Sequence, residues 1–219
     1  WSLASNFRNS SAFEHAATLR HIEFGWADVH RSFPGLGGDP DVAFHRLWAD
    51  RGERQIGGFA CAVPSLPAQT LVVLLHAARS PGARAGLDIA TVWDAAPPQR
   101  RAEVHSLVEQ IGAEVGFAAA VGDLDVYRGH PDYPLWRVAS HGGTRMEEWW
   151  ARIRAAPTRR AALLLVLRAP LVNVEHLEMS LWRRPTRREV AVEFFARPAR
   201  GIAEELRAVA ILRQTRRRS

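Results

Sequence analysis

A single carboxylate, Asp28, stands in the middle of a short apolar stretch, and a histidine, His30, follows two residues later. Alternate residues of a β-strand share a face, so both side chains would project from the same side of a strand. Aspartate is depleted in strands, and one at the centre of a strand needs a reason. Metal-dependent phosphoryl transfer supplies one, because carboxylates on adjacent strands hold Mg²⁺ against phosphate oxygens. The alternative is an edge-strand aspartate that faces water.

Two arginines, Arg20 and Arg31, flank this segment. They are candidates for contacts to phosphate, which a guanidinium binds through two parallel hydrogen bonds. His30 is expected either to contact a triphosphate or an acceptor, or to orient the Asp28 carboxylate. The sequence contains no lysine, so all 29 basic residues are arginine, and surface ion pairing is the alternative role for Arg20 and Arg31.

Two aspartates and one histidine elsewhere in the chain are expected to have structural roles. Asp123 and Asp125 have the spacing of a metal-binding Asp-x-Asp pair, but no Gly-Ser turn and helix precede them. They are expected to stabilise the loop that contains Gly129. His76 lies in an apolar helical segment and is expected to be a buried, hydrogen-bonded histidine rather than a ligand.

Length, composition and charge limit the class of protein. A chain of 219 residues, 47% hydrophobic and 24% charged, can bury a substantial core in one or two domains. Its one cysteine excludes an internal disulfide and a cysteine-rich zinc site. No apolar run approaches the ~20 residues that span a bilayer, and no secretory signal is visible, so we expect a cytoplasmic protein without a membrane partner. The net charge of +6 is compatible with nucleotide or nucleic-acid partners, although part of it lies in clusters such as the C-terminal residues 216–218.

The elements that must position these residues change in type along the chain. Residues 1 to about 33 are expected to form strands and loops. Asp39 as N-cap and Pro40 in the first turn predict a helix that continues to about Arg51. Residues 55–63 predict a strand or hairpin arm. Apolar residues at helical spacing predict helices at 67–79, 87–95, 98–112, 114–121, 144–155, 158–168, 171–182 and 200–213, with 122–134 as a loop. The apolar residues 161–167 are expected to form a buried helix.

Three segments, taken in order, resemble the uncharacterised nucleotidyltransferase family of bacteria, a branch of the polymerase-β-like nucleotidyltransferase superfamily. They are the Asp-Val-His strand of residues 27–31, the apolar helix of residues 71–78 with His76, and Leu87-Asp88 on the next helix. Trp48 and the Gly57-Gly58 turn also fall in the expected places. The resemblance covers roughly residues 12 to 170. It implies an α+β fold, in which residues 1–66 are the C-terminal part of a nucleotidyltransferase mixed sheet, and 67–219 are a predominantly helical domain with a basic C-terminal tail.

The resemblance also implies Mg²⁺-dependent transfer of a nucleoside monophosphate from a nucleoside triphosphate to an unknown acceptor, which could be a small molecule, a peptide or RNA. Such enzymes hold two metal ions with an Asp-x-Asp pair that follows a Gly-Ser turn, and a carboxylate on a later strand completes the site. Asp28 matches this third position, as metal ligand or as base, with His30, Arg31 and Arg20 as substrate contacts. The Gly-Ser turn and the Asp-x-Asp pair would lie before residue 1, so this chain is expected to be incomplete and inactive alone. The alternative is a non-catalytic helical module that binds a protein, peptide or RNA partner.

Overall fold

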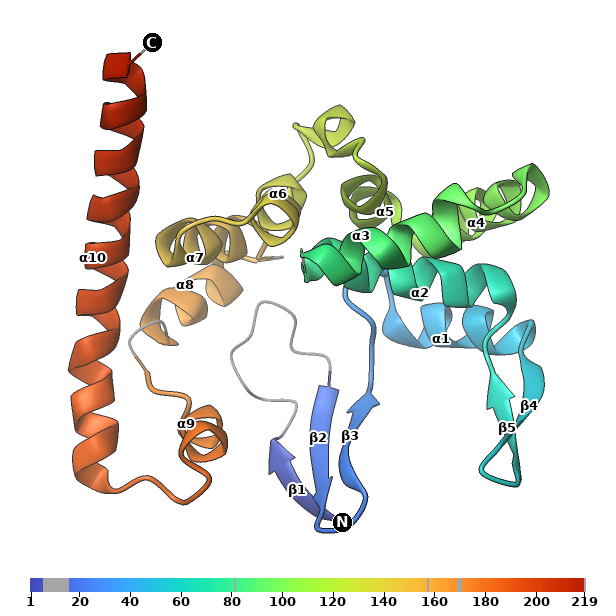
Figure 1. The fold of residues 1–219 in the computed structure, drawn as a ribbon, viewed down its shortest axis with the longest axis horizontal. Coiled ribbons are helices and arrows are strands. Elements are labelled where there is room, and N and C mark those ends of the chain that lie inside the picture. The colour runs from blue at the N-terminus through green and yellow to red at the C-terminus, as the bar shows by residue number, and fades with distance from the viewer. Residues whose placement is uncertain (6–15, 81, 157, 169–170, 219) are drawn as a thin grey trace. The chain divides into compact units, whose positions relative to one another are not determined.

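The computed structural model describes residues 1–5, 16–80, 82–156, 158–168 and 171–218 (Figure 1). Contacts divide the chain into two compact units. The first unit combines Trp1–His30 with Gly143–Ser219, and the second unit is Arg31–Gly142. The boundary expected between residues 66 and 67 lies inside the second unit. Because the units follow contacts and not ancestry, that domain boundary stays a prediction.

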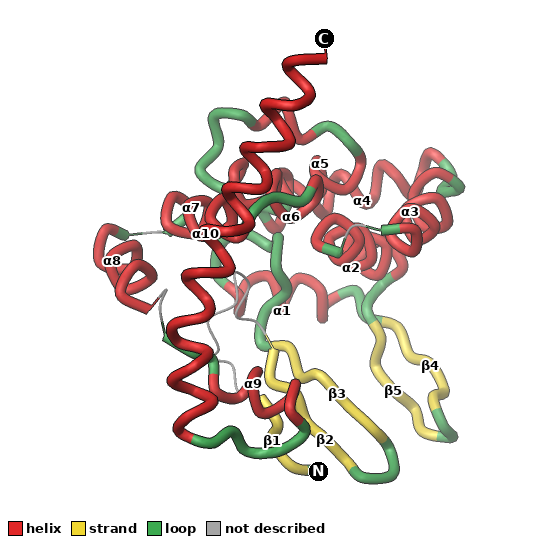
Figure 2. The backbone as a smooth tube through the Cα atoms, turned by 60° about the vertical axis from the view of Figure 1, so that its left-hand side comes forward, coloured by secondary structure: helices red, strands yellow, loops and turns green. Residues whose placement is uncertain are grey.

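The first unit contains an antiparallel sheet and a set of helices (Figure 2). Its strands follow the order β1–β2–β3, with bounds Ser2–Ser5, Ala16–His21 and Gly25–His30. Its helices are α7 (Arg145–Arg154), α8 (Arg159–Arg168), α9 (Val174–Leu181) and α10 (Arg187–Arg218). Helix α9 contacts β1, and α7 contacts both α8 and α10. The side chains of the basic tail, residues 216–218, lie outside the described side chains.

The second unit is mainly helical. Its elements are α1 (Pro40–Ala49), the hairpin β4 (Gly52–Ile56) and β5 (Phe59–Val63), α2 (Leu66–Arg79), α3 (Ala83–Ile89), the π-helical turn η1 (Ala90–Asp94), α4 (Pro98–Ile111), α5 (Glu114–Val121), the 3-10 turn η2 (Leu124–Tyr127) and α6 (Tyr133–His141). Helix α2 contacts α3, α4, α5 and α6. Its Leu71, Leu74 and Leu75 are fully buried, so α2 forms the centre of this unit's core.

The expected α+β class is confirmed, since small sheets occur with many helices. Within the described residues every strand pair is antiparallel, whereas the resemblance implied part of a mixed sheet. None of the described helices is both long and apolar enough to cross a bilayer.

Local start signals explain several elements. Asp39 caps α1 as predicted, because its Oδ1 accepts a hydrogen bond from the Asp41 N–H at 2.8 Å. The β4–β5 hairpin turns through Gly57 and Gly58 at φ values of +59° and +85°. Only glycine adopts this left-handed backbone without steric cost, which explains the Gly-Gly pair between the two strands.

Four expectations about burial and helix boundaries were wrong. Residues 161–167 do not form a buried helix, because α8 has no buried residue and its Leu163 and Leu164 are 58% and 50% exposed. His76 is exposed on α2, while its neighbours Leu75 and Ala77 are buried. Residues 133–141 form α6 where no helix was predicted, and α10 begins at Arg187 rather than near residue 200.

Candidate functional site on the β2–β3 hairpin

The register of the hairpin places three predicted site residues on one face. Thr18 lies opposite Asp28, Arg20 opposite Trp26, and Ala16 opposite His30. Directly opposed residues of an antiparallel pair project to the same side of a sheet, and so do alternate residues along each strand. The side chains of Arg20, Asp28 and His30 therefore share a face, as the spacing of Asp28 and His30 predicted.

The Asp28 carboxylate is held at one oxygen. The Thr18 hydroxyl donates to Asp28 Oδ1 at 2.7 Å, and Asp28 is exposed on β3, an edge strand of the sheet. No second hydrogen bond to this carboxylate is formed within the described part of the chain. Asp28 Oδ2 is thus available to a ligand, while Thr18 fixes the direction of the carboxylate. A hydroxyl in this position acts like the outer-shell partners that orient metal-binding carboxylates.

Asp28 by itself would supply one ligand to Mg²⁺. Among the described residues, no group of three or more His, Cys, Asp or Glu side chains could hold a metal ion. Mg²⁺ is commonly bound through one or two carboxylates, with substrate phosphates and water as its other ligands. The residues of this face therefore fit one position of such a site, and substrate phosphates would have to supply others.

Arg20 lies against two indoles. Its guanidinium carbon is 5.5 Å from the centre of the Trp26 ring and 5.6 Å from that of Trp182, within the range of cation–π attraction. The two rings meet edge to face at 6.3 Å. Trp182 follows α9 in a left-handed conformation, with φ of +57°. Arg20 is therefore engaged by aromatic rings, and its charge does not form an ion pair with Asp28.

A pocket of about 320 Å³ adjoins this aromatic cluster. Its lining comes from β1, β2, β3 and the α9 region: Ser2, Leu3, Ala4, Arg20, Trp26, Glu175, Glu178, Trp182, Arg183 and Arg184. Because it carries both carboxylates and guanidiniums, the pocket does not select one sign of charge. Arg20 thus faces a mixed polar pocket rather than a purely cationic phosphate site.

The two remaining predicted residues lie at the end of the strand. His30 is the last residue of β3 and is exposed. Arg31 is the first residue of the second unit. The structure therefore places Arg20, Asp28 and His30 on one hairpin face, and Arg31 directly follows the last residue of β3.

Of the Asp-x-Asp segment, the Asp125 side chain is engaged by neighbouring residues of the chain. Asp125 accepts hydrogen bonds from Arg128 at 2.5 Å and from the Tyr133 hydroxyl at 2.9 Å. The Arg128 guanidinium, followed by the Tyr133 hydroxyl, holds the pKa of the Asp125 carboxyl below its usual range. These contacts agree with the expected loop-stabilising role.

Sequence reasoning missed Thr18, Trp26 and Trp182. Thr18 could be found from the pairing of the two strands, because it lies opposite Asp28 once a three-residue turn is placed at residues 22–24. Trp182 carried no such signal, since it meets Arg20 only through the tertiary packing of α9. Comparisons with models of known families, with curated proteins and with solved structures found no match.

Proposed function

We propose that this chain carries one carboxylate of a Mg²⁺-dependent nucleotidyltransferase site. The reaction would transfer a nucleoside monophosphate from a nucleoside triphosphate to an acceptor hydroxyl. The observation that supports the proposal is the position of Asp28: it lies in the middle of β3, exposed, with Oδ1 fixed by Thr18 at 2.7 Å and Oδ2 available.

The chemistry is the one that the resemblance to nucleotidyltransferases implies, with the residues of this face in the roles that it gives them. The acceptor oxygen attacks the α-phosphorus, the bond from that phosphorus to the bridging oxygen of the β-phosphate breaks, and pyrophosphate leaves with both electrons of that bond. Metal ions, when bound, neutralise and align the phosphate oxygens. Asp28 Oδ2 would hold a metal ion or take the acceptor proton. Thr18 would keep the carboxylate aimed, and His30, on the same face, would contact substrate.

The test compares two carboxylate removals in the natural gene product. Asp28→Asn keeps the shape of the side chain and an oxygen that accepts from Thr18, but removes the charge. Glu23→Gln removes a carboxylate from the turn of the same hairpin. Pyrophosphate release and nucleotide incorporation are measured with Mg²⁺ and each of the four nucleoside triphosphates.

We expect Asp28→Asn to lower transfer by at least about 100-fold, because loss of even an outer-shell partner of a metal costs 10- to 100-fold. Glu23→Gln should stay within about twofold of the natural protein. Equal activity of the two variants, or no transfer by the natural gene product with any of the four nucleotides, would contradict the proposal. Either result would favour the non-catalytic binding module.

A further inference from the structure

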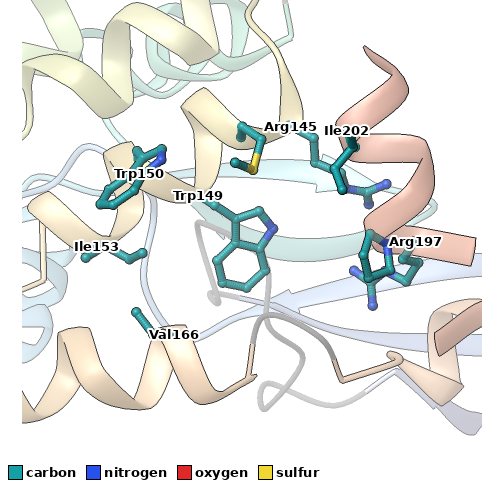
Figure 3. A pocket seen from close by; sticks show the side chains of 10 residues that line it. Arg145, Trp149, Trp150, Ile153, Val166, Arg197 and Ile202 are labelled. Atoms are coloured by element: carbon teal, nitrogen blue, oxygen red, sulfur yellow. The ribbon is translucent and has the colours of Figure 1, made fainter. Parts of the chain in front are cut away.

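Helices α7, α8 and α10 of the first unit surround a second pocket, of about 460 Å³ (Figure 3). Figure 3 shows the Trp149 ring projecting from α7 toward α10, with Arg197 on α10 and Val166 on α8. The residues that line the pocket are Arg145, Met146, Trp149, Trp150, Ile153, Val166, Arg197, Pro198, Gly201 and Ile202. Its volume is within the range of about 300–1,000 Å³ that small-molecule sites occupy.

The lining is apolar except for two guanidiniums, those of Arg145 and Arg197. A site with apolar walls and few polar groups binds a ligand whose body is apolar and whose orientation is set by those groups. The Trp149 ring is held in place by the Arg152 guanidinium, whose carbon lies 5.0 Å from the ring centre. The apolar wall is therefore partly fixed before any ligand enters.

Two described acidic side chains of α7 and α10 form ion pairs with arginines that do not line the pocket. Glu148 pairs with Arg152, and Glu193 pairs with Arg200. Within the described residues, neither Arg145 nor Arg197 forms an ion pair, and Arg197 donates to the Leu171 carbonyl oxygen at 2.6 Å. This wall of the pocket thus carries positive charge without a carboxylate partner.

The environment of Arg197 agrees with an excess of positive charge at this wall of the pocket. Burial, followed by the charge of Arg145, lowers the pKa of Arg197, while Glu193 opposes that effect. Arg200 and Arg152 add to the lowering. An anion between Arg145 and Arg197 would relieve their repulsion, and its hydrogen bonds would be charge-assisted.

We propose that this pocket binds an amphipathic small-molecule anion: an aliphatic body lies against Trp149, Trp150 and Val166, and a carboxylate or phosphate head meets Arg145 and Arg197. This site shares no residue with the Asp28 face, and its occupation does not depend on nucleotidyl transfer. Both head groups are anions that would bind the same two guanidiniums, so the ligand is either a fatty acid or an alkyl phosphate.

The test measures binding by isothermal titration calorimetry to the full chain, below the concentration at which each probe forms micelles. Decanoate and decyl phosphate carry the anionic head, decanol has a neutral head, and decyltrimethylammonium has a cationic one. We expect the anions to bind at least about tenfold more tightly than decanol or the cation, since a charge-assisted hydrogen bond is worth that factor or more. The ratio of the two anions identifies the preferred head.

Two matched variants assign the site. Arg145→Gln with Arg197→Gln should weaken decanoate binding at least about tenfold and leave decanol binding unchanged. Arg154→Gln removes an exposed guanidinium from the same helix, outside the pocket lining, and should change decanoate binding less than twofold. Circular dichroism melting checks that each variant folds.

Three results would overturn the inference. They are decanol binding as tightly as decanoate, equal losses in Arg154→Gln and in the double variant, and no binding of either anion to the folded natural chain. Because Asp28 is not used, any of these would leave the nucleotidyltransferase proposal standing. Failure of the Asp28→Asn test would likewise leave this pocket unaffected.

Discussion

Thr18 decides how the Asp28 carboxylate is held, because its hydroxyl donates to Oδ1 across the hairpin at 2.7 Å. Thr18→Val removes the hydroxyl but keeps the β-branched shape that suits a strand. We expect nucleotidyl transfer by the natural gene product to fall by about 10- to 100-fold, as for other outer-shell partners. The steady-state rate of pyrophosphate release measures the change. Thr18→Ser, which keeps the hydroxyl, should recover most of the rate, and an unchanged rate in Thr18→Val would exclude a positioning role.

Glu189 is a described carboxylate whose pKa is lowered by its contacts at the start of α10. It pairs with Arg183, and its Oε2 accepts from the Thr186 N–H at 2.7 Å and from the Thr186 hydroxyl at 2.9 Å. These contacts, with Arg183 first, lower the pKa of Glu189 from 4.5 to about 2. The carboxylate forms a capping box at the start of α10, where the Glu189 N–H donates to the Thr186 hydroxyl oxygen at 3.3 Å.

The sign of the pH effect follows from this lowered pKa. Glu189 stabilises the fold fully above pH 4.5, and the contribution is lost as the pH falls toward about 2. Hydrogen exchange of the first amides of α10 should therefore accelerate over that interval beyond the normal pH dependence. Glu189→Gln should already show fast exchange at neutral pH and no such step. A Glu189 carboxyl that titrates near 4.5 by NMR would contradict this prediction.

At the scale of elements, periodic helices with clear caps were predictable and irregular ones were not. Helices α1, α2, α4 and α5 fall close to their predicted ranges, because apolar residues recur at helical spacing between Asp, Pro and Gly signals. Helix α6 was missed because Gly129, Pro131 and Pro134 indicate a loop. Pro134 instead lies in the first turn of α6, where a missing N–H has no cost.

Helix α10 likewise contains a proline in a part that was not predicted to be helical. Pro198 lies inside the helix, although an interior proline removes a backbone hydrogen bond and costs about 3 kcal/mol. The predicted start near residue 200 was therefore too late.

For the candidate site, the alternation of side chains along a strand predicted that Asp28 and His30 share a face. The stacking of Arg20 against Trp182 could not be predicted, because it depends on how α9 packs against the sheet.

Two helical glycines of the second unit provide a matched test of packing. A Cβ on Gly116 of α5 would lie 2.6 Å from Leu75 Cδ2 and 2.8 Å from Trp136 Cζ2, so α2 and α6 crowd this position. A Cβ on Gly86 of α3 would meet nothing within 4 Å. Helix propensity alone favours alanine over glycine by about 0.8–1.0 kcal/mol at both sites.

We therefore expect the two Gly→Ala variants to have opposite effects. Gly116→Ala should lower the free energy of unfolding by about 1–3 kcal/mol, the usual cost of overpacking a core. Gly86→Ala should raise it by up to about 1 kcal/mol. Urea unfolding measures both. Stabilisation by Gly116→Ala would show that α2, α5 and α6 do not pack as closely as described.

For the whole molecule, the core is distributed unevenly. Among the described side chains, the buried hydrophobic residues of the first unit are only Ala17 and Ala151, and all the others belong to the second unit. Large apolar side chains such as Leu164, Leu167 and Phe195 of the first unit are exposed. Burial of apolar area is the main favourable term in folding. We therefore expect the first unit to have the smaller free energy of unfolding. A ligand in the α7–α8–α10 pocket would stabilise this weaker unit by mass action.

The contrast between the units predicts how a core mutation spreads. Leu74 on α2 is 0% exposed, whereas Leu164 on α8 is 50% exposed. Leu74→Ala should destabilise the second unit by about 2–5 kcal/mol, and Leu164→Ala should cost less than about 1 kcal/mol.

Native-state hydrogen exchange of the intact chain measures these changes. The amides of α4 and α5 should exchange the most slowly besides those of α2, and Leu74→Ala should accelerate their exchange by the factor that corresponds to its loss of free energy of unfolding. Amides of α7 should change little in Leu74→Ala, because the contacts of Leu74 lie within the second unit. Uniform acceleration of all helices would instead mean that the two units unfold as one cooperative body, and the small core of the first unit would then be stabilised by the second.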